Sequence, residues 1–258
     1  MTQISKHEPG TFCWAELGTT DSGAAKKFYG GLFGWGSSDI PMGDQGNYTM
    51  FQKEGDDVGA TYTFGPQQKG VPPHWLTYVS VESADDAASK AKASGGKVVM
   101  EPFDVFDQGR MALLQDPTGA TFGVWQPKAG IGAKRWNEPN AVCWAELLTD
   151  DTGKAKQFYA DVFGWGSKIG GDYTEFQKGK DSFAGMMGIR KEWGEMPPNW
   201  GIYILVDDPD ATARKATELG GKVVVPPTDI PDVGRFATLA DPQGAHFSVI
   251  KLSPKQGH

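Results

Sequence analysis

CWAELGTTDSGAAKKFYGGLFGWGS, from Cys13 to Ser37, returns in the second half of the chain as CWAELLTDDTGKAKQFYADVFGWGS, from Cys143 to Ser167. Of these 25 aligned positions, 17 are identical. The correspondence continues downstream, where PPHW at 72–75 matches PPNW at 197–200 and DPTGA at 116–120 matches DPQGA at 241–245. A repeat of this length indicates a duplicated domain, because solenoid units run to about 20–50 residues.

The chain of 258 residues is long enough for two ordinary domains. We expect a first domain over residues 10–127, a linker over 128–139 and a second domain over 140–252. The linker prediction rests on a segment that contains Gly and Pro and has no periodic apolar pattern.

Each copy shows the same order of elements. In the first copy we expect a strand at 12–17, a helix at 22–33 and strands near 35–40, 47–53 and 58–64. The pattern then restarts with a strand at 74–81, a helix at 83–94 and strands near 97–100, 110–115 and 121–126. Each copy is therefore predicted to be α+β, with two βαβββ units that pair within the copy and form an incomplete barrel around a cleft.

Composition and charge limit the classes of partner that we expect the protein to bind. A formal net charge of −7 without a Lys/Arg cluster argues against nucleic acid. No apolar run approaches the roughly 20 residues of a membrane span, and no signal peptide is recognisable, so we expect a cytoplasmic protein. Cys13 and Cys143 occupy matching positions, which predicts two separate thiols rather than a disulfide. The expected oligomeric state is a monomer or a homodimer.

The order of these motifs resembles the vicinal oxygen chelate superfamily of glyoxalases, bleomycin-resistance proteins and extradiol dioxygenases. The resemblance rests on the early strand, the Asp-led helix ending in Phe-Tyr, the Phe-Gly-Trp close and the Asp-Pro-x-Gly turn. The Trp-x-Glu-Leu strand and the Pro-Pro-His/Asn-Trp segment resemble a two-domain bacterial branch described as glyoxalase-like or as hydroxylases. The resemblance implies tandem domains, each with a small-molecule cleft.

Metal-dependent members of the superfamily place His or Glu ligands on the inner faces of their strands. Carried over by position, the first ligand falls on Trp14 and Trp144, which cannot bind a metal. The final carboxylate falls on Gly123 and Ser248. The middle position falls on His74 or on Leu76, and the second copy has Asn199 where the first has His74. The usual metal triad is therefore missing from both copies. Of two alternatives, a bound divalent metal and no bound metal, we favour no bound metal. Glu16 and His74 are the remaining candidates for a non-standard metal site.

Two acidic and two basic residues are the candidate catalytic groups. Glu16 and Glu146 face the predicted cleft by strand alternation, where an apolar aromatic environment would raise the pKa of a carboxylate and suit a general base. Arg110 and Arg235 could each receive an oxyanion of the substrate. Alternatively, Arg110 pairs with Glu16 or Asp107, and Arg235 repeats this with Glu146.

The remaining candidates would contact the ligand. Aromatic and polar side chains could line the cleft at Trp14, Tyr48, His74, Tyr78, Trp125, Trp144, Tyr173, Asn199 and Tyr203. Two functions stay open: a glyoxalase-like lyase or dioxygenase/hydroxylase-like enzyme acting on a small organic molecule, and a metal-free protein that binds such a molecule for sequestration or antibiotic resistance.

Overall fold

A computed structural model describes residues 3–254 of the chain. The first copy contains β1 (Phe12–Thr19), α1 (Ser22–Phe33), β2 (Gly36–Pro41), β3 (Asn47–Lys53), β4 (Asp56–Thr63), β5 (His74–Ser80), α2 (Ala84–Ala93), β6 (Lys97–Val105), β7 (Gly109–Gln115) and β8 (Thr121–Pro127). The second copy contains β9 (Val142–Thr149), α3 (Thr152–Phe163), β10 (Gly166–Gly170), β11 (Tyr173–Lys178), β12 (Asp181–Gly188), β13 (Asn199–Leu205), α4 (Pro209–Glu218), β14 (Lys222–Ile230), β15 (Gly234–Ala240) and β16 (His246–Leu252).

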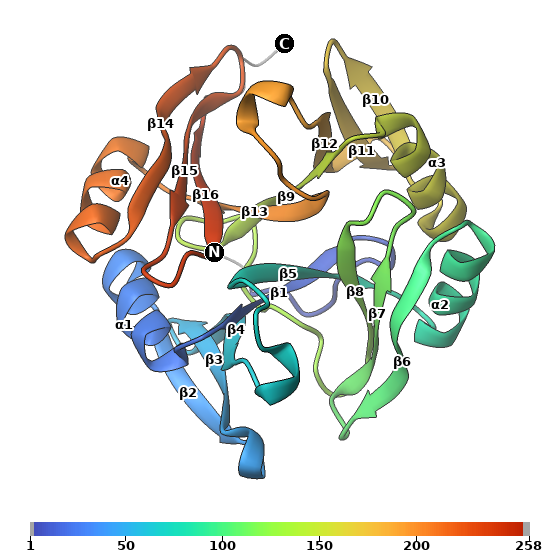
Figure 1. Ribbon diagram of the computed structural model, residues 1–258, viewed down its shortest axis with the longest axis horizontal. Helices are drawn as coiled ribbons and strands as arrows, with labels where there is room; N and C mark the ends of the chain where they lie inside the picture. The colour runs from blue at the N-terminus through green and yellow to red at the C-terminus, as the bar shows by residue number, and fades with distance from the viewer. Residues whose placement is uncertain (1–2, 255–258) are drawn as a thin grey trace. The chain divides into compact units, whose positions relative to one another are not determined.

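Each copy builds one eight-stranded sheet (Figure 1). The strand order is β2-β3-β4-β1-β5-β8-β7-β6 in the first sheet and β10-β11-β12-β9-β13-β16-β15-β14 in the second. Both sheets combine two βαβββ units of the same copy, which confirms the predicted α+β fold and the pairing within each copy. Short 3₁₀ turns at Gly43–Gln45, Pro66–Gln68 and Lys191–Trp193 were not predicted.

β6 is the element that the sequence predicted least well. It extends to Val105, whereas the residue pattern indicated a strand that ends near residue 100. Its pairing with β7 shifts register twice, between Val98 and Met100 and again between Met100 and Phe103. A strand with such bulges at a sheet edge loses the period-2 alternation on which the prediction relied.

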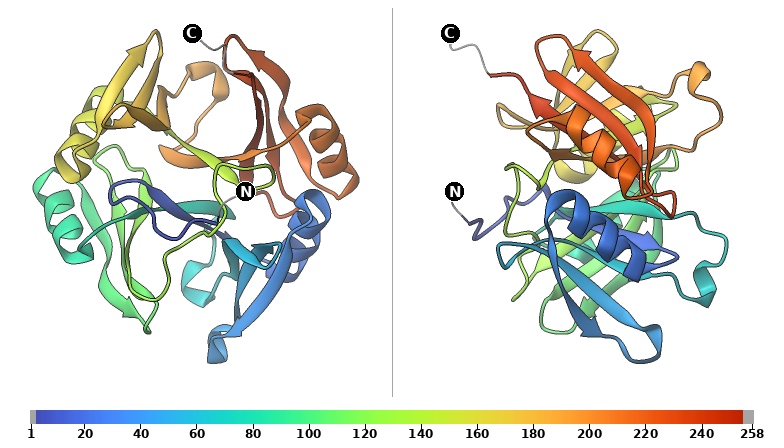
Figure 2. Two further views of the ribbon diagram at one scale, coloured as in Figure 1. Left: turned by 180° about the vertical axis from the view of Figure 1, so that it is seen from behind. Right: turned by 90° about the vertical axis from the view of Figure 1, so that its left-hand side faces the viewer.

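Tertiary contacts divide the chain into two compact units that do not follow the two copies. One unit holds the described residues up to Trp14 together with Leu76–Gly132 and Trp144–Gly201. The other holds Ala15–Trp75, Ala133–Cys143 and the described residues from Ile202 on. Each unit therefore takes one βαβββ region from each copy. Within them α2 lies beside α3 and α1 beside α4, as the views in Figures 1 and 2 agree.

A buried polar network lies at the centre of each unit. The Tyr29 hydroxyl accepts a hydrogen bond from Trp75 Nε1 at 3.0 Å and donates one to Asp241 Oδ2 at 3.1 Å. Burial, and then the charge of Asp241, raises the pKa of Tyr29, so the phenol keeps its proton. In the other unit, Tyr159 accepts from Trp200 at 2.7 Å and donates to Asp116 at 2.9 Å. Each tyrosine thus joins a tryptophan of its own copy to a turn of the other copy.

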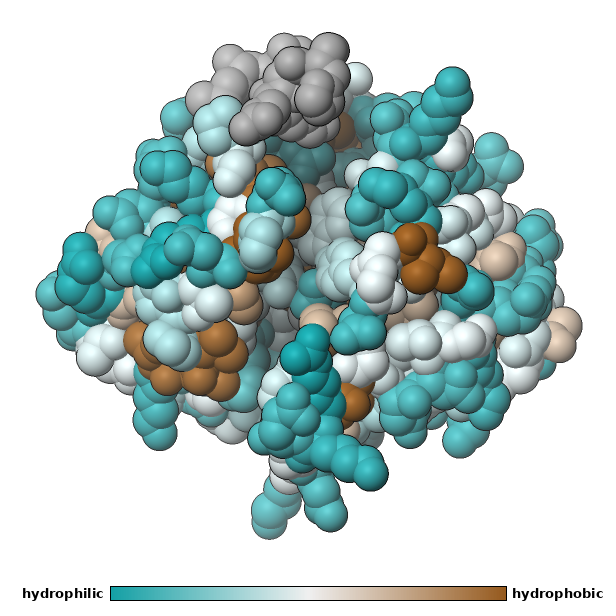
Figure 3. Space-filling view, turned by 90° about the horizontal axis from the view of Figure 1, so that it is seen from above, coloured by the Kyte–Doolittle hydropathy of each residue, from teal (hydrophilic) through white to brown (hydrophobic). Residues whose placement is uncertain are grey.

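In the part of the chain that the structure describes, no helix is both long and apolar enough to cross a membrane. On the face in Figure 3, hydrophilic residues predominate and the hydrophobic residues form small separate groups. The expected location and oligomeric state stay predictions.

Replacing Tyr29 by Phe should lower the free energy of unfolding by about 2–3 kcal/mol, because Trp75 and Asp241 each lose a partner in a buried place. Denaturant unfolding followed by tryptophan fluorescence measures the change. Tyr159→Phe should have a similar effect, and Ser38→Ala on exposed β2 should change stability by less than about 0.5 kcal/mol. Equal stability of Tyr29→Phe and wild type would contradict a structural role for the network.

Candidate functional site

Glu16 is the central polar residue of the site in the first copy. It lies in β1, where every residue is buried, and only 9% of Glu16 is exposed. The Tyr48 hydroxyl of β3 donates a hydrogen bond to Glu16 Oε2 at 2.8 Å. Tyr62 of β4 faces Tyr48 in the antiparallel register. Burial, and then the negative charge of Glu16, raises the pKa of Tyr62, which indicates that this phenol lies close to the carboxylate.

Residues after β4 extend this group, which we call the Glu16 site: Glu16, Tyr48, Tyr62, Phe64, Gln68 and His74. Gln68 Nε2 donates to the Tyr62 hydroxyl at 3.2 Å. The rings of Phe64 and His74 lie with centroids 5.9 Å apart at an interplanar angle of 30°. A carboxylate therefore lies in one compact unit with two phenols and two further rings.

Tyr62, Phe64 and Gln68 were not among the predicted site residues. The strand expected at 58–64 contained a usable signal, because period-2 alternation places Tyr62 and Phe64 on one face. Gln68 follows in an unpredicted 3₁₀ turn, so no strand pattern could have identified it.

The second copy repeats the carboxylate–phenol pair. The Tyr173 hydroxyl donates to Glu146 Oε2 at 2.8 Å and accepts from Trp144 Nε1 at 3.0 Å. Burial, and then the charge of Glu146, raises the pKa of Tyr173, so it stays a donor at neutral pH. Gly185 of β12 provides the space, because a Cβ atom there would overlap the Tyr173 hydroxyl and lie 2.9 Å from Trp144 Nε1.

His74 and Asn199 make the same hydrogen bond in their two copies. His74 Nδ1 lies 2.9 Å from the Pro72 carbonyl oxygen, and Asn199 Nδ2 donates to the Pro197 oxygen at 2.9 Å. A carbonyl oxygen can only accept, so Nδ1 carries the proton of this bond. The shared bond is structural, and only His74 adds a second ring nitrogen.

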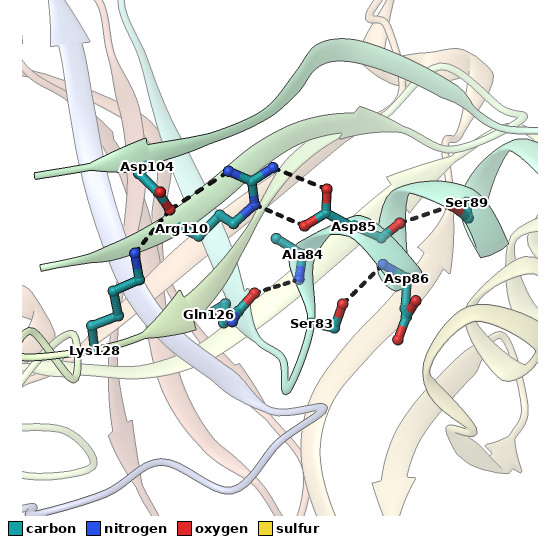
Figure 4. A network of polar contacts seen from close by, with 9 residues as sticks. All are labelled: Ser83, Ala84, Asp85, Asp86, Ser89, Asp104, Arg110, Gln126 and Lys128. Atoms are coloured by element: carbon teal, nitrogen blue, oxygen red, sulfur yellow. Dashed lines mark hydrogen bonds and ion pairs between the residues drawn. The ribbon is translucent and has the colours of Figure 1, made fainter. Parts of the chain in front are cut away.

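Arg110 and Arg235 do not pair with the glutamates, which corrects one of the two expectations. Arg110 binds Asp85 in a bidentate manner at 2.7 and 2.9 Å and contacts Asp104 at 3.5 Å (Figure 4). Arg235 binds Asp210 at 2.6 and 2.9 Å and Asp229 at 2.9 Å. The pairing with Glu16, Asp107 or Glu146 was wrong because an aspartate in the first turn of the preceding helix offers a planar carboxylate that matches the guanidinium. A catalytic role of either arginine stays a prediction.

The donor set does not fit the metal that the fold family implies. The ring of Tyr78 lies over Gly123, where the final carboxylate was expected, and a Cβ atom at this glycine would overlap the ring. In the second copy, the Ser248 hydroxyl lies 2.9 Å from Thr238 Oγ1. Among residues 3–254, no group of three or more His, Cys, Asp or Glu side chains is arranged to hold a metal ion. Within these residues, neither the usual triad nor the Glu16 and His74 pair has a complete set of ligands.

Three further residues were predicted to contact the ligand, and the structure shows what surrounds them. Trp14 is 9% exposed and lies two residues before Glu16 in β1. Trp125 Nε1 donates to the Gly130 carbonyl at 2.8 Å, which ties its indole to the start of the predicted linker. The Tyr203 ring lies 6.3 Å from that of Phe236. Contact of Trp14, Trp125 and Tyr203 with a ligand stays a prediction.

The two cysteines carry no covalent chemistry. Both are free thiols, as expected, and each Sγ lies 3.5 Å from a backbone oxygen, that of Tyr78 for Cys13 and that of Tyr203 for Cys143. Burial raises the pKa of Cys143 to about 12 and raises that of Cys13 as well. Neither thiol is therefore a nucleophile near neutral pH.

Comparison with protein-family models shows the family to which the chain belongs. The model of the Glyoxalase/Bleomycin resistance protein/Dioxygenase superfamily matches residues 11–124 and again residues 142–249. The chain belongs to this superfamily. Its two matches coincide with the two copies read from the repeat, and the recognition of the family from the motifs is confirmed.

Relatives and solved structures agree with this membership. The Mycobacterium tuberculosis protein named "Putative glyoxylase CFP32" is 43% identical over 263 residues, covering 99% of this chain and 100% of the relative. "Anthracycline biosynthesis protein DnrV" of Streptomyces peucetius is 37% identical over 265 residues, covering 96% of each chain. The crystal structure of the Mn(II)-bound glyoxalase from Novosphingobium aromaticivorans superposes with a TM-score of 0.66 at 17% identity, covering 97% of this chain and 83% of that one. The 2,3-dioxygenase LapB from Pseudomonas sp. KL28 also gives 0.66, at 12% identity over 100% and 96%. These two structures show the shared fold alone.

His74→Asn should leave the free energy of unfolding within about 0.5 kcal/mol of wild type, because Asn199 already makes the equivalent bond in the second copy. His74→Leu should cost about 1 kcal/mol, since the Pro72 carbonyl loses its donor. Chemical denaturation of both variants checks this, and equal losses in the two would contradict the structural reading.

Proposed function

We propose that the chain is a metal-independent acid–base enzyme that shifts a proton next to a carbonyl group in a small organic molecule. The observation that carries the proposal is the buried Glu16 carboxylate held by the Tyr48 hydroxyl at 2.8 Å. A positioned carboxylate in a largely apolar place is a competent general base. The first copy is the proposed active one, because Tyr62 and His74 stand there where the second copy has Met187 and Asn199.

Glu16 would accept the proton from the carbon beside the carbonyl. Tyr48 fixes the carboxylate through the hydrogen bond to Oε2 and so acts as a positioning residue. As the C–H bond breaks, its electrons move into the carbonyl and negative charge develops on the oxygen. In a substrate with a hydroxyl group on the first carbon, Glu16 then returns the proton to the former carbonyl carbon. The hydroxyl group loses its proton and becomes the new carbonyl, and the oxyanion takes up that proton, so the net reaction is an isomerisation in which every atom is retained.

Tyr62 is the proposed donor to the developing oxyanion. Its raised pKa keeps the phenol protonated. Its hydroxyl accepts from Gln68, and within residues 3–254 no acceptor is recorded for its own proton, which can therefore be given to a substrate oxygen. A preorganised donor at the site of charge development lowers the barrier more than it strengthens substrate binding.

A planar substrate suits the rings around the glutamate. Phe64 and His74 lie close together beside Tyr62, and aromatic faces favour flat ligands. The names of the relatives point the same way, one to glyoxylase activity and one to anthracycline biosynthesis. These features also favour a second function, in which the chain binds a planar aromatic compound without converting it, as a sequestration or resistance protein would.

Glu16→Gln should reduce turnover of the hemithioacetal of methylglyoxal and glutathione by at least about 100-fold, because the amide cannot accept the proton. The reaction run in D₂O also reports solvent deuterium at the product carbon by NMR. Glu146→Gln is the matched control and should retain most of the rate. Turnover of Glu16→Gln at the wild-type rate would exclude Glu16 as the base.

The binding function is distinguished with alizarin, a planar hydroxyanthraquinone. If binding alone is the function, alizarin should stabilise wild type and Glu16→Gln to a similar extent in a thermal-shift assay, with no turnover of either probe. Stabilisation should fall in Phe64→Ala. Turnover that depends on Glu16 would exclude this alternative.

Removal of metal provides a separate test of the reaction. Treatment with EDTA followed by gel filtration should leave the turnover rate unchanged, because the residues present do not make a ligand set. Elemental analysis of protein purified without chelator should find no stoichiometric divalent metal. A rate abolished by EDTA and restored by Mn²⁺ would overturn the metal-independent mechanism.

A further inference from the structure

A pocket outside the Glu16 site lies at the start of α3, within a single compact unit. Its volume is about 450 Å³, and its lining includes Thr152 and Lys156 of α3, Ile169 of β10 and Thr174 of β11. Arg190, two residues after β12 and directly before the 3₁₀ turn at Lys191–Trp193, also lines the pocket. A volume of this size is within the range of small-molecule sites.

The first copy has an ion pair in the equivalent place. Lys26 Nζ contacts Asp39 Oδ2 at 2.9 Å, and Thr49 Oγ1 donates to Asp39 Oδ1 at 2.6 Å. Asp39 and Thr49 are register partners across β2 and β3. The aspartate therefore ties the helix to the strand pair with one carboxylate.

The second copy keeps the cation and the hydroxyl but has lost the carboxylate. Ile169 takes the place of Asp39, is the register partner of Thr174 and is 62% exposed. In the part of the chain that the structure describes, the Lys156 ammonium has no recorded ion pair or hydrogen bond. The Arg190 guanidinium lies over the Trp193 ring, 5.7 Å from its centroid, and within residues 3–254 no ion pair is recorded for it.

The charges of the lining favour an anion. Lys156 and Arg190 contribute two positive charges against one negative charge from Asp172, and no ion pair is recorded for this aspartate either within residues 3–254. The pocket also lies at the positive end of the helix dipole of α3, which spans 12 residues. Ile169 and Met187 add apolar surface beside these charges.

We propose that this pocket binds a small organic carboxylate, whose carboxylate group takes the position that Asp39 occupies in the first copy. Lys156 and Thr174 supply the contacts that Lys26 and Thr49 make to Asp39, and Arg190 adds a planar donor that suits a carboxylate. The site is distinct from the Glu146 pair, because Thr174 and Tyr173 are neighbours in β11 and point to opposite faces.

Benzoate titrated into the full-length protein at constant ionic strength tests the proposal, with benzamide as the uncharged control. Amide NMR signals of Thr152 and Thr174 should shift with benzoate and stay in place with benzamide. Lys156→Met should weaken benzoate binding about tenfold or more, as loss of a charge-assisted hydrogen bond predicts. Lys26→Met is the matched control in the first copy and should bind benzoate like wild type.

Ile169→Asp is the decisive variant. It restores the first-copy ion pair, so it should fold at least as well as wild type and lose benzoate binding. Unchanged binding in Ile169→Asp or Lys156→Met would overturn the proposal, as would equal binding of benzamide or the absence of any benzoate-dependent shift. Stronger shifts of the same signals with inorganic phosphate than with benzoate would assign the pocket to phosphates and overturn the carboxylate assignment.

Discussion

Two buried phenols hold together regions of the chain that are far apart in sequence. Tyr29 joins Trp75 to Asp241, and in the other unit Tyr159 makes the corresponding bonds. Asp241 also accepts hydrogen bonds from the backbone of its own turn, at Gln243 and Ala245, so the carboxylate fixes the turn and the helix at once. Because a buried polar group without a partner is costly, neither the helix nor the turn can move independently. Each core therefore needs residues from both copies.

This network explains why the motifs predicted the fold so well and the chemistry so poorly. The Phe-Tyr pair, the Pro-Pro-x-Trp segment and the Asp-Pro-x-Gly turn supply the tyrosine, tryptophan and aspartate of the network in both copies. Local patterns also located most helices and strands to within a residue or two. They could not reveal that Tyr29 meets an aspartate of the other copy, because that bond spans 212 residues and has no periodic signature.

The sequence predicted the part of the site that lies on a single strand. Alternation along β1 identified Glu16, and the repeat identified Glu146. Their tyrosine partners were expected only as ligand contacts, and the arginines were expected to pair with the glutamates. The ligand contacts of the tyrosines stay predictions, whereas the pairing of the arginines was wrong. Neither the tyrosine bonds nor the arginine partners could be predicted, since a hydrogen bond depends on which strands are neighbours and how far a side chain reaches. Arg110 binds Asp85 in the first turn of α2 and also contacts Asp104, and neither pairing follows from strand alternation.

Several differences between the copies fall at positions that line the two sites. The phenol, indole and carboxylate of the network are the same in both, whereas Tyr62 and Phe64 in the first copy correspond to Met187 and Ile189 in the second, and Asp39 corresponds to Ile169. None of these residues takes part in the network, so they can change without leaving a buried group of the core unpaired. The constraint that fixes the fold thus leaves each copy free to diverge in ligand chemistry. A glutamate beside a phenol in one copy and a pocket lined by two cations in the other are two outcomes of that freedom.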